Sequence, residues 1–157
     1  DTAPRAWFIR GLVAAERGDS ATLAQAIAAI APSKQADIQA DRQELTGRAA
    51  LLDGNAGAAL TSFEQAAANR QQAIDYRGMA RALALAGEAS LKLGKPSEAA
   101  VFYLRAGRSS LLQGDTAAAT PQLKRAEELA RQTSQTGIVE EIARLRKAAA
   151  ERAPVRT

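Results

Sequence analysis

The fold is decided by two stretches that follow one pattern, GRAALLDGNAGAALTSFEQA at residues 47–66 and GEASLKLGKPSEAAVFYLRA at residues 87–106. Each stretch opens with a glycine and carries a second glycine seven residues later. A small residue and then a bulky one follow at a spacing of four, Ala59 with Phe63 and Ala99 with Tyr103. A glycine of this kind ends a helix, and residues four apart share one helical face. The pattern returns after forty residues and therefore predicts a repeating helical hairpin.

The same glycine spacing occurs on both sides of these stretches, at Gly11 with Gly18 and at Gly107 with Gly114. Between the glycines, helix-ending and helix-capping residues recur at nearly even spacing, with the weakest break near residues 69–75. Phe63 and Tyr103 are expected to be core residues wedged between hairpins. These signals predict about eight helices, near residues 4–17, 20–31, 35–53, 56–72, 74–93, 97–112, 116–132 and 136–151.

The composition agrees with an all-α fold. The chain has 157 residues, 46% of them hydrophobic but only 4% aromatic, and alanine dominates the apolar content. Alanine favours closely packed helices and is depleted in sheets. The length fits one domain, which we expect to span residues 1–151, with a disordered tail at residues 152–157.

Several classes of chemistry are excluded because the chain contains no cysteine and no histidine. Thiol redox chemistry, imidazole or thiolate metal sites and histidine-based proton transfer all need these residues. We therefore expect no enzymatic activity, no cofactor, no metal site and no small-molecule substrate. No apolar run approaches the roughly 18 residues that a transmembrane helix needs, so no transmembrane segment is expected.

The repeat resembles the tetratricopeptide repeat over about residues 4–126. Three units match that pattern of large, small and helix-ending positions: Trp7, Gly11, Gly18, Leu23, Ile27 and Ile30; Gly47, Gly54, Ala59, Phe63 and Ala66; Gly87, Gly94, Ala99, Tyr103 and Ala106. The resemblance implies a right-handed stack of antiparallel helical hairpins, an α-solenoid. The period of 36 and then 40 residues exceeds the usual 34, which implies longer helices.

The resemblance also implies where a partner would bind. In this family the first helix of each hairpin lines a concave face, which here implies eight groove residues: Phe8, Leu12, Asp41, Glu44, Arg48, Arg81, Glu88 and Leu91. The lysine and asparagine clamp of chaperone-binding members is missing at these places. Arg48 and Arg81, both expected to be exposed, offer paired hydrogen bonds to carboxylates instead.

These observations favour a non-enzymatic scaffold or adaptor that binds another protein or a peptide segment. The alternative is a module that binds nucleic acid or an anionic surface through its C-terminal half, since residues 79–157 hold thirteen basic residues against eight acidic ones. Strong nucleic-acid binding is not expected, because the net charge of +4 supplies few phosphate contacts.

The compartment is less constrained by the sequence. Cytoplasm, periplasm and a lipoprotein are all compatible with the absence of cysteine. Because the chain begins with Asp1 rather than Met, our expectation is a periplasmic or outer-membrane-anchored protein. It would be the soluble part of an exported bacterial lipoprotein or assembly factor.

Overall fold

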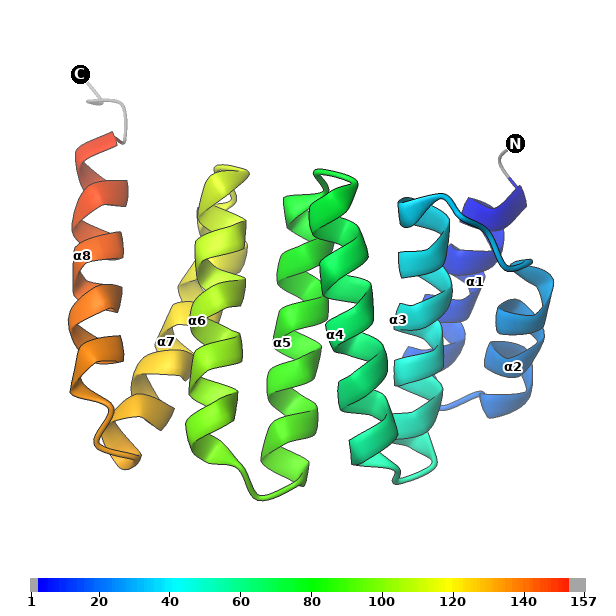
Figure 1. Cartoon of the computed structure of the whole chain (residues 1–157), viewed down its shortest axis with the longest axis horizontal. Coiled ribbons are helices and arrows are strands. Elements are labelled where there is room, and N and C mark those ends of the chain that lie inside the picture. Colours follow the sequence, from blue (N-terminus) through cyan, green and yellow to red (C-terminus); the bar gives the residue numbers. More distant parts are fainter. Residues whose placement is uncertain (1–2, 153–157) are drawn as a thin grey trace.

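The computed structural model describes residues 3–152, and within that range it consists of eight α-helices and no strand. The helices are α1 (Ala3–Glu16), α2 (Ser20–Ala29), α3 (Ala36–Leu52), α4 (Ala56–Gln72), α5 (Tyr76–Lys92), α6 (Pro96–Leu112), α7 (Thr116–Gln132) and α8 (Thr136–Arg152). Successive helices run in opposite directions and pack against one another, and α1 also contacts α3 and α6 also contacts α8 (Figure 1). The predicted all-α stack of helical hairpins is confirmed.

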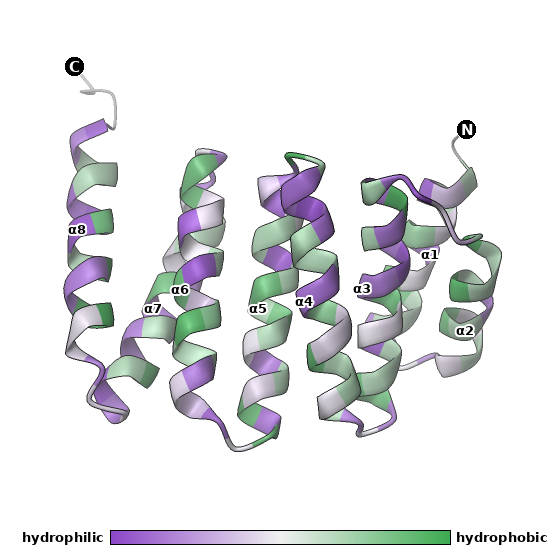
Figure 2. Cartoon of the chain, in the orientation of Figure 1, coloured by the Kyte–Doolittle hydropathy of each residue, from purple (hydrophilic) through white to green (hydrophobic). Residues whose placement is uncertain are grey.

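Each helix ends within two residues of its predicted position. The predicted disordered tail lies outside the described residues, except for Arg152, which is the last residue of α8. Every helix carries both hydrophobic and hydrophilic residues (Figure 2). None of the described helices is both long enough and apolar enough to cross a membrane.

The turns between α3 and α8 share one geometry. All six of these helices have 17 residues and are separated by three residues, so each helix and its turn occupy twenty. The middle turn residue has a positive φ, as in Gly54 (77°) and Gly94 (72°). The next N–H bonds back into the preceding helix, from Asn55 to the Ala50 carbonyl at 2.8 Å in the first of these turns. This is the Schellman motif, which satisfies carbonyls that a helix end leaves free.

Glycines inside the helices allow close packing. A Cβ added to Gly47 would lie 2.5 Å from Phe63 Cε1, and one on Gly87 would lie 2.7 Å from Tyr103 Cε2. Gly107 and Leu123 repeat this arrangement in α6 and α7. Phe63 and Tyr103 therefore pack against the partner helix of their own hairpin, and each also belongs to a hydrophobic cluster that includes residues of the next hairpin, as expected.

Candidate functional site

An ionic cluster lies inside the N-terminal half of the stack. Arg70 of α4 is only 1% exposed, and its Nη2 lies 2.6 Å from Oδ1 of Asp41 and 3.6 Å from Oε1 of Glu44, both on α3. Arg5 of α1 also donates to Asp41, at 3.0 Å. Burial raises the pKa of Asp41 although Arg70 and Arg5 both act to lower it. The two buried carboxylates are costly, and the surrounding guanidinium groups offset that cost.

Local sequence explains how a buried arginine fits here. The helical positions twenty residues from Arg70 in either direction hold small residues, Ala50 and Ser90. Space for the larger side chain comes from Gly78, where an added Cβ would lie 2.7 Å from Arg70 Cδ. The ring of Phe8 completes the enclosure, with the Arg70 guanidinium 5.3 Å from its centre.

Glu44 holds two further arginines at the surface of this cluster. Arg81 of α5 donates from Nε at 2.9 Å and from Nη2 at 3.0 Å, and Arg48 of α3 donates from Nη2 at 3.3 Å. Burial acts to lower the pKa of Arg81, but the hydrogen bonds and charge of Glu44, together with the charges of Asp75 and Asp41, outweigh it and the pKa is raised. Within residues 3–152 no hydrogen bond reaches Nη1 of either arginine. Both guanidinium groups are thus fixed along one edge and open along the other.

The charges of this cluster do not balance. Arg5, Arg48, Arg70 and Arg81 carry four positive charges, and the three carboxylates that contact them belong to Asp41, Glu44 and Asp75. The cluster therefore carries one more positive charge than negative charges.

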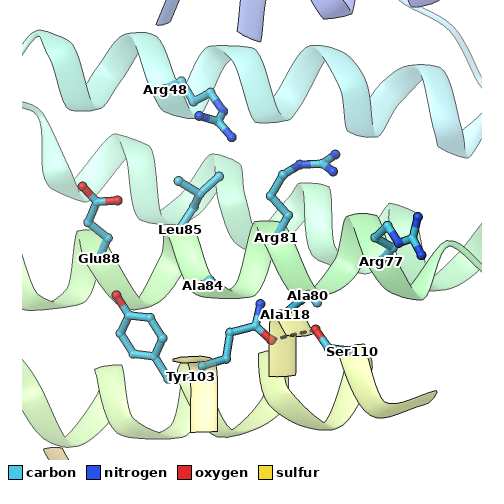
Figure 3. Close-up of a pocket in the computed structure, with 11 residues that line it drawn as sticks. Arg48, Arg77, Ala80, Arg81, Ala84, Leu85, Glu88, Tyr103, Ser110 and Ala118 are labelled. Atoms are coloured by element: carbon cyan, nitrogen blue, oxygen red, sulfur yellow. Dashed lines mark hydrogen bonds between the residues drawn. The ribbon is translucent and has the colours of Figure 1, made fainter. Parts of the chain in front are cut away.

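These free edges border a cavity of about 420 Å³, which we call the arginine groove. Side chains from α3, α5, α6 and α7 line it, and they approach it from opposite sides in Figure 3. Its polar lining consists of Arg48, Arg77, Arg81, Glu88, Tyr103, Ser110 and Gln122, and its apolar lining of Ala80, Ala84, Leu85 and Ala118. A 2.6 Å hydrogen bond joins the Ser110 hydroxyl and the Gln122 amide, which closes the groove between α6 and α7.

The structure places the eight predicted groove residues in three groups. Arg48, Arg81 and Glu88 line the arginine groove. Phe8, Asp41 and Glu44 are buried, at 1%, 4% and 0% exposure, so their expected open position is corrected. They are enclosed because Arg70 draws both carboxylates inward and stacks over the phenyl ring. Leu12 and Leu91 are half-buried, and each packs against a hydrophobic core cluster.

Sequence analysis missed Arg70, Arg77 and Tyr103 as parts of this site. Arg70 carried a signal, since it is a large charged residue at a repeat position that otherwise holds small ones. Arg77 precedes Arg81 by one helical turn and so shares its face. Tyr103 matched the expected core position, but it is only half-buried and its hydroxyl reaches the groove (Figure 3).

The free edges of Arg48 and Arg81 can donate hydrogen bonds to an anion in the groove. Among residues 3–152 no three acidic side chains gather as metal ligands would. The two buried carboxylates are held by arginines, which leaves them unsuited to proton transfer. No model of a known protein family matches this sequence, and no curated protein is significantly similar to it.

Proposed function

We propose that this protein is a non-enzymatic scaffold of the tetratricopeptide-repeat kind, which binds a segment of a partner protein in the arginine groove. The observation that carries the proposal is the pair of guanidinium groups fixed by the buried Glu44, with their free edges open to the groove. Arginines held in this way lose little freedom when they bind a carboxylate, which favours affinity.

The shape of the groove supports a polypeptide as the ligand. Three first helices of hairpins, α3, α5 and α7, contribute to the lining, as the repeat resemblance implies for a concave face. Apolar side chains such as Leu85 lie between the polar ones, which suits a peptide that buries side chains as well as charges. The forty-residue period distinguishes this stack from the usual 34-residue repeat and lengthens each helix.

The test of this proposal uses the absence of cysteine from the chain. Ala84→Cys places one thiol in the groove, and a photo-crosslinker attached there should capture a partner protein in cells of the source organism. Glu64→Cys, on an exposed position of α4 outside the groove, is the matched control. Purified partner should then bind the Arg77→Glu variant at least about fivefold more weakly. Capture from Glu64→Cys alone would contradict the proposal.

Arg77 is a better test residue than Arg48 or Arg81. The side chains of Arg48 and Arg81 are only 18% and 34% exposed, so the expectation that both are exposed is corrected. A reversed charge there would face Glu44 and destabilise the fold. The Arg77 side chain is 69% exposed, and its ion pair with Asp115 spans 3.7 Å.

The periplasmic or outer-membrane location stays a prediction, separate from the groove. Cells of the source organism can be fractionated and each fraction probed with an antibody against this protein. Detection in the cytoplasmic fraction alone would contradict the prediction.

A further inference from the structure

Along the arginine groove, one face of α5 carries positive charge at one end and negative charge at the other. Arg77 and Arg81 are four residues apart, and Glu88 follows seven residues after Arg81. At these spacings the three side chains share a helical face, and all of them line the groove (Figure 3). Seven residues of helix rise by about 10 Å, so a positive end and a negative end are separated by that distance.

The positive end is built for an anion. Arg81 is fixed by two hydrogen bonds to Glu44, and Arg48 is held against the same carboxylate from across the groove. Arg77 adds a third guanidinium group, which is bound only loosely to Asp115 at 3.7 Å. A carboxylate placed here would meet free N–H groups without any reorganisation of the site.

The negative end is built for a cation. Glu88 is exposed and forms no ion pair with any residue of the described range. The Tyr103 hydroxyl lies at the same end of the groove as Glu88 (Figure 3). The pKa of Tyr103 is raised by burial and by the charge of Glu88, which together outweigh the charge and hydrogen bond of Arg125, so the hydroxyl stays protonated. The floor between the two ends is apolar, with Ala84 and Leu85.

We propose that the arginine groove selects an extended peptide segment with an acidic residue and, two to four residues away, a lysine or arginine. This inference rests on the proposed function and specifies the partner. Extended chain advances about 3.3 Å per residue, so two to four residues, with the reach of their side chains, span the 10 Å between Arg81 and Glu88. A nucleic acid fits less well, because Glu88 would repel the next phosphate along the backbone.

The experiment selects peptides from a phage-displayed library of random twelve-residue sequences. The wild-type chain should enrich acid–base pairs at spacings of two to four by at least threefold over the starting library. The Glu88→Lys variant should lose that preference and enrich a second acidic residue in place of the basic one. Glu64→Lys makes the same charge change on an exposed residue of α4 outside the groove, and it should select as the wild type does. Glu88 and Glu64 are both exposed, so neither variant is expected to shift the melting temperature.

Each other outcome has one meaning. Peptides that bind the wild type but not Arg77→Glu, and show no acid–base pairing, would overturn this inference while the proposed function stands. Peptides that bind Arg77→Glu and Glu88→Lys as tightly as the wild type would overturn the proposed function, as would a library that yields no binder. If a twenty-nucleotide single strand displaced the selected peptides at lower concentration than the free peptides do, a nucleic-acid ligand would replace the peptide.

Discussion

Ile74 holds a backbone conformation that its side chain disfavours. Its φ is 58°, at the turn position where Gly54, Gly94 and Gly114 stand elsewhere. A β-branched residue is strained in this left-handed region. The side chain is 71% exposed, so it gains little from burial. The strain has no compensation in the packing around it.

We therefore predict that Ile74→Gly stabilises the protein by about 0.5 to 1 kcal/mol, which is the relief of strain less the extra chain entropy of glycine. Urea denaturation measures the change. Ala73→Gly is the control, because Ala73 has a φ of −80° and gains nothing from glycine. Equal destabilisation by both substitutions would show that Ile74 is not strained.

Arg70 is the residue on which the ionic cluster depends. We predict that Arg70→Met costs about 3 to 5 kcal/mol of stability, because Asp41 loses its closest partner while both carboxylates stay buried. Adding Asp41→Asn should restore part of the loss by removing the buried charge. Denaturation of the two variants against the wild type tests this, and a loss below about 1 kcal/mol from Arg70→Met would contradict it.

At the scale of the helix, two glycines that both lie within helices have opposite roles. Gly47 of α3 is covered by the Phe63 ring, whereas a Cβ on Gly57 of α4 would approach nothing closer than 3.9 Å. We predict that Gly47→Ala destabilises by about 1 to 3 kcal/mol through overpacking. Gly57→Ala should stabilise by about 0.5 to 1 kcal/mol, since alanine is the better helix former. Thermal melts of both variants measure the two changes in stability. A change of the same sign in both variants would contradict this account of the packing.

The helices were predictable because their ends carry local signals. Gly54 and Gly94 mark helix ends by their backbone freedom, and Asn55 and Asp115 cap the helices that follow. The sequence signal for a helix break was weakest near residues 69–75. The left-handed residue there is Ile74, and isoleucine is not a residue typical of turns. The backbone there takes the common geometry in spite of its sequence.

The site was only partly predictable. Arg48, Arg81 and Glu88 line the groove, and the resemblance to the tetratricopeptide repeat had implied this position for residues on the first helix of each hairpin. The burial of Asp41 and Glu44 was not foreseen, since it depends on Arg70 from the neighbouring helix. A contact between helices of this kind has no short-range signal in the sequence.

At the scale of the whole molecule, burial is concentrated in the middle of the stack. α5 and α6 each bury eight residues, whereas α8 buries only Ile142. In a stack where each unit contacts its neighbours alone, the ends open more easily than the centre.

We predict that backbone amides of α8 exchange with solvent at least about tenfold faster than those of α5. Hydrogen exchange followed by mass spectrometry of peptic fragments measures both helices in one sample. Equal protection of the two would mean that the stack unfolds as one unit.

The regular turns also determine how many residues can be added to or removed from such a protein without disrupting its groove. From Ala36 onward each helix and its turn occupy twenty residues. An insertion of twenty would reverse the direction of every later helix and carry its groove-facing residues to the opposite side. An insertion of forty would restore both. Duplication of one hairpin is thus the smallest change in gene length that leaves the groove continuous, and the reach of the protein along a partner evolves in whole hairpins.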